Sequence, residues 1–148
     1  MNDLPPGTAK PTLHPRVIIA EDFVLIQENI RKAVQDRCAV IATVEDGASA
    51  LSAVSTHSPD VLLLDVSLPD MSGFTVLEQL LKSGSSVCVI LLTAYADRAY
   101  VERAFELGAK GYVLKGKMWI DLPPAIRQVT SGGTYKSPLL DKRSAVHP

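Results

Sequence analysis

The sequence is poor in cysteine, in net charge and in long apolar runs. Its 148 residues carry a formal net charge of −1, so bulk attraction to nucleic acid or to an anionic membrane is not expected. No apolar stretch reaches the length of a membrane-spanning helix. The two cysteines, Cys38 and Cys88, lie at or near the starts of apolar runs and are predicted to be small buried hydrophobes. Because no secretion signal is present, we expect a cytoplasmic protein with reduced thiols.

What is present fits one globular domain with two tails. Hydrophobic residues make up 47% of the chain and charged residues 21%, an ordinary globular balance that can build a sizeable core. Residues 1–15 contain four prolines and predict a disordered leader. Residues 134–148 are too short for another domain and predict a C-terminal tail or the start of a linker. The domain itself is predicted over residues 16–133.

Apolar runs and helical periodicities alternate along this domain. Short apolar runs between turn residues predict strands buried on both faces, and apolar residues at i, i+3 and i+7 predict helices. The predicted strands are Arg16–Ala20, Ala39–Val44, Asp60–Asp65, Val87–Thr93 and Gly111–Leu114. The first four predicted helices are Val24–Gln35, Ala48–Ser55, Ser72–Lys82 and Asp97–Leu107. A fifth helix is predicted to begin with Asp121 as N-cap, to hold Pro123 and Pro124 in its first turn and to stop at Gly132-Gly133. This alternation favours an α/β fold with a doubly wound, five-stranded parallel sheet and five helices. The flavodoxin-like strand order 2-1-3-4-5 is expected, although sequence alone leaves the order open.

Four of the predicted strands run into a polar residue that can do chemistry. Glu21 and Asp22 follow the first strand, and the third strand ends at Asp65. The fourth strand ends at Thr93, and Lys115 follows the fifth. In an open parallel α/β sheet, ligands bind outside the carboxyl ends of the strands. The sequence therefore predicts one site that holds three carboxylates, a hydroxyl and an ammonium group.

This set of groups indicates metal-assisted phosphoryl chemistry. Three carboxylates in one pocket repel each other unless a proton or a cation relieves them. Oxygen ligands without histidine or cysteine favour a hard cation, Mg²⁺ or alternatively Mn²⁺, over zinc. An aspartate carboxylate can act as a nucleophile toward phosphorus. Lys115 can pair with a phosphoryl oxygen, and Thr93 can donate a hydroxyl hydrogen bond.

Each of these residues also has a purely structural explanation. Asp22 could cap the helix that follows it, and Asp65 could begin a turn. Thr93 could simply end a strand, Lys115 could be solvated, and Tyr112 could be a core residue. The coincidence of all the polar residues at the same predicted edge favours the functional interpretation, but the residues alone leave both open.

Five segments together resemble the receiver domain of bacterial two-component response regulators. They are Ile-Ala-Glu-Asp at 19–22, Glu-Asp-Gly at 45–47, Leu-Leu-Asp-Val-Ser-Leu-Pro-Asp-Met-Ser-Gly at 63–73, Leu-Thr-Ala at 92–94 and Gly-Ala-Lys-Gly-Tyr-Val-Leu-Lys at 108–115. Each segment is weak, but the ordered set at these spacings is specific and extends from about Arg16 to Gly133. The sequence Gly-Gly-Thr-Tyr-Lys-Ser-Pro-Leu-Leu is similar to the end of receivers that precede a helix-turn-helix DNA-binding domain.

The resemblance implies a role for each residue of the predicted site. Asp65 would accept the phosphoryl group, and Mg²⁺ would be held by Glu21, Asp22, Asp65 and the backbone carbonyl of Ser67. Glu21 would act largely through water. Pro69 would help to shape the loop after the third strand.

The same resemblance implies a conformational switch. Thr93 and Lys115 would contact the phosphoryl group, and Tyr112 would change rotamer as Thr93 is drawn toward it. Gly73 would shape the loop beside Asp65. Gly116 departs from the family, in which many members have a proline with a cis peptide after the lysine, and no cis bond is expected here.

The predicted function is a phosphorylation switch that accepts a phosphoryl group from a histidine kinase or phosphotransfer protein and hydrolyses it slowly, without being a turnover enzyme. Tyr100, Arg103 and Leu107 share one flank of a predicted helix, so a partner or a second copy is expected on the face made by the fourth helix, fifth strand and fifth helix. No contact of this segment itself with nucleic acid or membrane is expected. Whether a DNA-binding domain follows is left open.

Two other functions remain as alternatives. A pseudo-receiver would act as an adaptor without phosphoryl chemistry. A flavin-binding electron carrier of the same architecture would need a hydroxyl- and glycine-rich phosphate loop after the first strand. This chain has Glu-Asp-Phe-Val at 21–24 instead, which would repel a phosphate in the absence of a cation.

Overall fold

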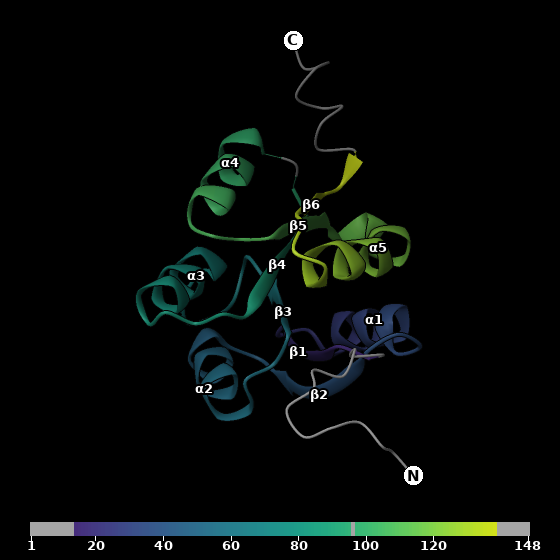
Figure 1. The fold of residues 1–148 in the computed structure, drawn as a ribbon, viewed down its shortest axis with the longest axis horizontal. Coiled ribbons are helices and arrows are strands. Elements are labelled where there is room, and N and C mark those ends of the chain that lie inside the picture. Colours follow the sequence, from purple (N-terminus) through teal and green to yellow (C-terminus); the bar gives the residue numbers. More distant parts are fainter. Residues whose placement is uncertain (1–13, 96, 139–148) are drawn as a thin grey trace, which may run out of the picture.

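A parallel sheet forms the centre of the molecule, with helices on both of its faces (Figure 1). This computed structural model describes residues 14–95 and 97–138. Six strands lie in the order β2-β1-β3-β4-β5-β6. Their bounds are Arg16–Ala20 (β1), Ala39–Val44 (β2), Val61–Asp65 (β3), Cys88–Thr93 (β4), Gly111–Leu114 (β5) and Tyr135–Lys136 (β6). The predicted fold class and the order of the first five strands are confirmed.

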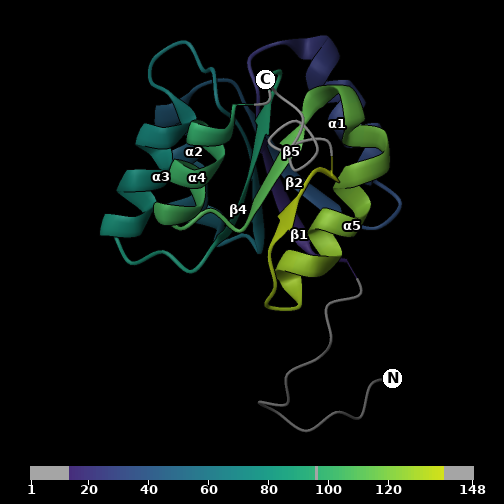
Figure 2. The same cartoon turned by 90° about the horizontal axis from the view of Figure 1, so that it is seen from above.

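The helices form two layers. Seen from above, α2, α3 and α4 cover one face of the sheet, and α1 and α5 cover the other (Figure 2). Their bounds are Val24–Val34 (α1), Gly47–His57 (α2), Gly73–Lys82 (α3), Arg98–Glu106 (α4) and Met118–Thr130 (α5), with a 3₁₀ turn at Lys115–Lys117 (η1). Each of the first four helices lies within one or two residues of its predicted bounds.

Alternate residues of the central strands fill two separate halves of the core. Leu62 and Leu64 of β3 face the cluster beneath α2, α3 and α4, whereas Val61 and Leu63 face the cluster beneath α1 and α5. All four side chains are fully buried. A strand covered on both faces must be apolar at every position, which is why these strands are continuous apolar runs rather than alternating ones.

The start of α5 differs from its prediction. The helix begins at Met118, directly after the 3₁₀ turn, so Asp121 lies inside the first turn and is not the N-cap. Pro123 and Pro124 consequently lie in the second turn. The buried face of the helix begins earlier than expected because Met118 packs into the core at 4% exposure, one turn before Leu122. The N-cap rule for aspartate was outweighed by this packing.

A sixth strand lies where only a tail was expected. Tyr135 and Lys136 pair in parallel with Gly111 and Tyr112 of β5. The predicted sheet was therefore one strand short, because two residues are too few to carry a strand periodicity. Of the predicted tails, residues 1–13 and 139–148 lie outside the described residues.

Three further expectations concern single features. No cis peptide bond occurs among the described residues. Cys38 is buried, as predicted, and burial raises the pKa of its thiol to about 11, while Cys88 is only partly buried. None of the helices in the described part of the chain is long and apolar enough to cross a membrane.

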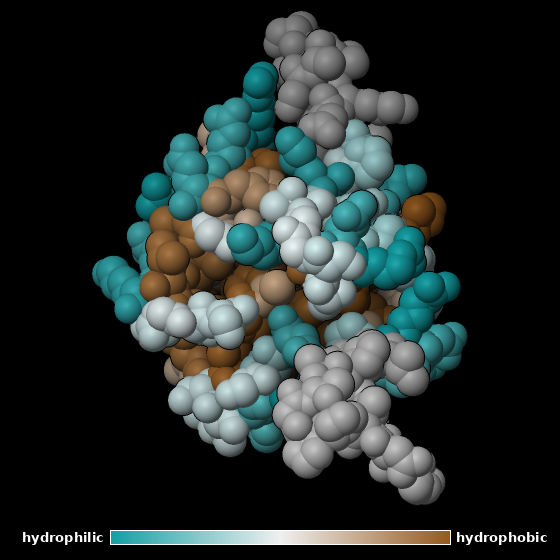
Figure 3. Space-filling view, viewed as in Figure 1, coloured by the Kyte–Doolittle hydropathy of each residue, from teal (hydrophilic) through white to brown (hydrophobic). Residues whose placement is uncertain are grey.

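The surface at the end of the sheet where the strands begin is partly apolar and partly polar. Figure 3 shows apolar residues gathered around α3 and toward its neighbours α2 and α4, with polar residues around them. Leu81 of α3 is one of the exposed apolar side chains, at 57% exposure. No cluster of acidic side chains able to hold a metal is found there among the described residues.

A substitution at Gly73 tests how tightly the loop after β3 packs. A Cβ atom at Gly73 would lie 2.7 Å from the backbone oxygen of Asp65 and 3.0 Å from the Cα of Val66, and neither backbone atom can move easily. We expect Gly73→Ala to lower the free energy of unfolding by about 1–3 kcal/mol, measured by urea denaturation. Gly116→Ala is the matched control, because its Cβ meets no atom within 4 Å. Equal denaturation midpoints for both variants would contradict this packing.

Candidate functional site

The strand ends predicted to carry chemistry meet at one edge of the sheet. β1 pairs with β3 up to Ala20 and Leu64, so the residues that follow, Glu21 and Asp65, lie side by side. β4 pairs with β5 at Thr93 and Leu114, which brings Lys115 to the same edge. The expected juxtaposition of all these residues is confirmed, and it follows directly from the strand order.

Three carboxylates form an acidic cluster at this edge. One oxygen each of Glu21, Asp22 and Asp65 lies within 4.8 Å of the others. Glu21 is fully buried and Asp65 is 3% exposed. Asp22 does not cap α1, since its N-cap is Phe23 and no side chain accepts a capping bond there. The buried Oδ1 of Asp22 has no hydrogen-bond partner among the described residues.

This arrangement fits a hard cation. Buried carboxylate oxygens at mutual coordination distance repel each other, and an unpartnered buried oxygen is costly unless a ligand satisfies it. All the donors are oxygens, and no histidine or cysteine belongs to the cluster. Oxygen-only donor sets of this kind suit Mg²⁺ or Mn²⁺.

Lys115 connects the cluster to β5. Its Nζ lies 2.9 Å from Oε1 of Glu21 and 3.1 Å from Oδ1 of Asp65. The side chain is only 19% exposed, so the alternative of a solvated lysine is wrong. Burial alone would lower the pKa of Lys115, but the interactions with Glu21 and Asp65 outweigh it and raise that pKa. The ammonium group therefore stays charged at the centre of the site.

In Glu21, unlike Lys115, the effect of burial on the pKa outweighs the effect of the neighbouring groups. Burial raises its pKa above the ordinary value of 4.5, and the ion pair with Lys115 offsets part of that rise. A bond from the backbone N–H of Phe23 to Oε2 of Glu21 also favours the charged form, while the charge of Asp65 opposes it. A neighbouring cation therefore favours the charged form of Glu21.

The loop after β3 is folded tightly against Asp65. The backbone N–H of Ser67 donates to Oδ1 of Asp65 at 3.1 Å, and Ser67 also pairs with Ser72 in a short antiparallel bridge. Gly73 closes the loop by donating its N–H to the carbonyl of Val66. Asp65 therefore does begin a turn, as its structural alternative held, and it belongs to the acidic cluster as well.

Thr93 and Tyr112 lie on the neighbouring strands β4 and β5. Thr93 is buried, and its hydroxyl oxygen accepts from the backbone N–H of Tyr95 at 3.1 Å. Tyr112 is fully buried and points inward, and its hydroxyl has no well-formed hydrogen bond to a described residue. Burial raises the pKa of Tyr112 to about 12, and the interaction with the Thr93 side chain opposes this rise.

The roles of two further aspartates were not predicted from the sequence. Asp70 accepts bonds from the backbone N–H groups of Gly47 (2.7 Å) and Ala48 (2.9 Å), which ties the loop after β3 to the start of α2 and lowers the pKa of Asp70. Its place in the motif at 63–73 could have suggested a role. Asp121, expected to be an N-cap, instead accepts bonds from Tyr135 and Ser137.

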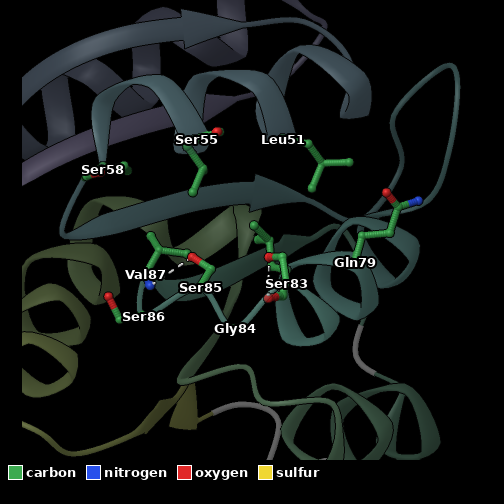
Figure 4. A pocket seen from close by; sticks show the side chains of 12 residues that line it. Leu51, Ser55, Ser58, Gln79, Ser83, Gly84, Ser85, Ser86 and Val87 are labelled. Carbon is green, nitrogen blue, oxygen red and sulfur yellow. Dashed lines mark hydrogen bonds between the residues drawn. The ribbon is translucent and has the colours of Figure 1, made fainter.

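A separate cavity lies at the far edge of the sheet, between the ends of α2 and α3. Figure 4 shows the serine side chains Ser55, Ser83, Ser85 and Ser86 around it. The residues that line it include no acid, lysine, arginine or histidine. Ser58, one of its lining residues, precedes β3, so this cavity and the acidic cluster are at opposite ends of the strands.

The family model for the response regulator receiver domain matches residues 17–126. The chain belongs to this family. It is 31% identical over 125 residues to the transcriptional regulatory protein DegU of Brevibacillus brevis, covering 83% of this chain and 53% of DegU. It is thus a receiver domain of two-component systems. The chain spans about half the length of that relative. Family membership removes the flavin-carrier alternative.

Solved structures agree with this assignment. A LuxR-family two-component response regulator from Aurantimonas sp. SI85-9A1 matches with a TM-score of 0.84 and 25% identity, covering 89% of this chain and 96% of that one. A structure of two RcsB dimers bound to two parallel DNAs matches with a TM-score of 0.80 and 25% identity, covering 87% of this chain and 67% of that one.

The pKa of Glu21 should respond to loss of its ion pair. We expect Lys115→Met to raise it further, because Lys115 is the largest of the interactions that lower it. Carboxyl ¹³C chemical shifts followed against pH would measure the change, with Lys117→Met, an exposed lysine, as control. A raised pKa means that the folded state holds the proton more tightly than the unfolded chain. The free energy of unfolding therefore falls as pH rises from 4.5 through the folded pKa. An unchanged Glu21 pKa in Lys115→Met would refute the ion pair.

Proposed function

We propose that Asp65 accepts a phosphoryl group from a histidine kinase or phosphotransfer protein. The observation that carries this proposal is the position of its Oδ1, 3.1 Å from the Lys115 ammonium and beside two further carboxylates at the edge of the sheet. An oxygen of Asp65 attacks phosphorus, the P–N bond of a phosphohistidine breaks, and the nitrogen leaves with the electron pair. Phosphoryl transfer asks the protein mainly for positioning and for neutralisation of charge.

The surrounding residues take the roles that their groups allow. Lys115, now paired with Asp65, contacts a phosphoryl oxygen, and the Thr93 hydroxyl donates to another. Mg²⁺, with Mn²⁺ as alternative, would be held by Glu21, Asp22 and Asp65, together with the backbone carbonyl of Ser67. When bound, the cation neutralises negative charge on the carboxylates and on the phosphoryl oxygens.

Thr93 and Tyr112 form the proposed switch. The Thr93 oxygen accepts from the Tyr95 amide, so moving the hydroxyl toward a phosphoryl group gives up that bond and rearranges the loop after β4. Tyr112 lies opposite Leu91 of β4, and its side chain belongs to the core cluster that also contains Val101 and Ala104 of α4. A shift of Thr93 changes the volume open to this ring, which couples the site to the surface of α4.

The output of the switch is proposed to be transcription control. The similar protein DegU, of which this chain covers 53%, is named a transcriptional regulatory protein, and this name supports the proposal. With a net charge of −1, the receiver itself is not proposed to contact nucleic acid or membrane.

Labelling of Asp65 tests the proposed function. A small phosphodonor with Mg²⁺ should add one hydroxylamine-sensitive phosphoryl group to the parent and none to Asp65→Asn, as measured by intact mass. Asp22→Asn should label far more slowly, because the cation loses one of its charged ligands. Equal labelling of the parent and Asp65→Asn would refute the acceptor. No labelling of the parent would favour the pseudo-receiver alternative.

The proposed output surface is a dimer face on α4, β5 and α5. Tyr100 is 54% exposed, its ring centre lies 5.7 Å from that of Phe74, and Arg103 of the same flank pairs with Glu78 at 3.6 Å. Because β6 pairs with Gly111 and Tyr112 along the outer edge of β5, the exposed side chains of this face come from the helices, with Tyr100 on α4 and Trp119 and Ile120 on α5. The RcsB dimers among the similar structures support self-association as the output.

Sedimentation of the phosphorylated protein tests this face. We expect phosphorylation to shift the parent toward dimer and Tyr100→Ala to weaken that dimer about tenfold or more, since removing a central aromatic anchor typically costs at least ~1.4 kcal/mol. Phe23→Ala is the control, because Phe23 is a comparably exposed aromatic at the start of α1. A dimer that survives Tyr100→Ala but not Phe23→Ala would place the interface on α1.

A further inference from the structure

Asp121 receives two side chains from the segment that follows α5. It lies in the first turn of the helix and is 4% exposed. Its Oδ1 accepts from the hydroxyl of Tyr135 at 3.0 Å, and its Oδ2 accepts from the hydroxyl of Ser137 at 2.7 Å. Burial, followed by the hydrogen bond to Asp121 and the charge of Asp121, raises the pKa of Tyr135 to about 12. A buried carboxylate is retained only where such bonds compensate its lost hydration.

Ser137 links Asp121 to the backbone of β5 by hydrogen bonds. Its side chain is fully buried, and its hydroxyl oxygen accepts from the N–H of Leu114 at 3.1 Å. Its own N–H donates to the carbonyl of Tyr112 at 3.0 Å. The segment therefore runs along β5 and ends beside the residue that precedes Lys115.

The direction of these bonds depends on Asp121. A serine hydroxyl has one hydrogen and two lone pairs, and an ionised carboxylate can only accept. Because Asp121 takes the hydroxyl hydrogen, a lone pair of Ser137 is left facing the Leu114 N–H. The 2.7 Å bond to a charged acceptor is of the stronger kind.

The outer side of β5 at Leu114 has no strand to hold it. On the inner side, Leu114 pairs with Thr93 of β4. On the outer side, β6 pairs only with Gly111 and Tyr112. Among the described residues, the Leu114 N–H is held by the Ser137 hydroxyl alone, immediately before the chain turns into the 3₁₀ segment that begins with Lys115.

We propose that Asp121 and Ser137 are positioning residues for Lys115. They fix the backbone from which the Lys115 side chain reaches Glu21 and Asp65 at 2.9 and 3.1 Å. Asp121 acts through Ser137, and Ser137 acts through the Leu114 amide. The consequence for phosphorylation rests on the proposed function, whereas the geometric part does not.

NMR tests the geometric part without any phosphodonor. In Ser137→Ala, we expect the Leu114 amide to exchange with solvent roughly tenfold faster, in line with loss of its one hydrogen bond, and the ¹⁵Nζ signal of the Lys115 ammonium to weaken. Ser131→Ala is the matched control, because Ser131 is exposed and its hydroxyl makes no hydrogen bond to a residue in the described part of the chain. A Leu114 amide and a Lys115 ammonium signal unchanged in Ser137→Ala would overturn the proposal.

A double-mutant cycle separates positioning from general support of the fold. Ser137→Ala should slow phosphorylation of Asp65 roughly three- to tenfold in the parent and have no further effect in Lys115→Met, because its action passes through Lys115. Equal slowing in both backgrounds would show a role independent of Lys115 and overturn the proposal. An unslowed Ser137→Ala would do so too.

The positioning of Lys115 can still be measured if the parent is not phosphorylated or if Ser137→Ala does not fold. If the parent itself is not phosphorylated, the proposed function fails while the NMR signals still decide the positioning of Lys115. If Ser137→Ala does not fold, Asp121→Asn carries the same measurements. That variant keeps the size of the side chain and removes its charge, so the same changes are expected in the same direction and to a smaller extent. Asp121→Asn signals and rates identical to the parent would overturn the part played by Asp121.

Discussion

The ion pair of Lys115 is the interaction on which the functional edge of this receiver depends. Its ammonium joins the residue after β1 to the last residue of β3, through Glu21 at 2.9 Å and Asp65 at 3.1 Å. Without it, neighbouring buried carboxylates would face each other as like charges with little solvent to screen them. Because Lys115 follows β5, the pair forms only when three strands end at the same edge, and the sheet order is therefore part of the site.

Because Lys115 is largely buried, the position of its side chain depends on the backbone of β5, which immediately precedes it. β5 is only four residues long, and its pairing with β4 holds one side of it. The other side is completed by residues that come after α5, through β6 and Ser137. The edge strand that receiver topology would leave open is thus covered by the chain itself, and the cover reaches the residue next to Lys115.

Much of this architecture could be predicted from the sequence because the central strands are buried on both faces. A run such as Val61–Asp65 has no polar position until it leaves the core, so its end, and with it Asp65, is visible in the sequence. The start of α5 and the strand β6 were not visible in this way. Met118 joins the core after a 3₁₀ turn that carries no periodic signal, and Tyr135–Lys136 is defined by its pairing partner rather than by its own residues.

The aspartates show why the candidate site was predicted better than its supports. Asp46 and Asp97 each precede a helix and accept bonds from its first amides, as the capping rule requires. Asp121 also stands near a helix start, yet its oxygens face Tyr135 and Ser137. A capping bond is local and can be predicted from neighbouring residues, whereas the partners of Asp121 come from a segment whose position is set by the folded sheet. Residues whose roles depend on strand ends were therefore within reach of the sequence, and residues whose roles depend on distant side chains were not.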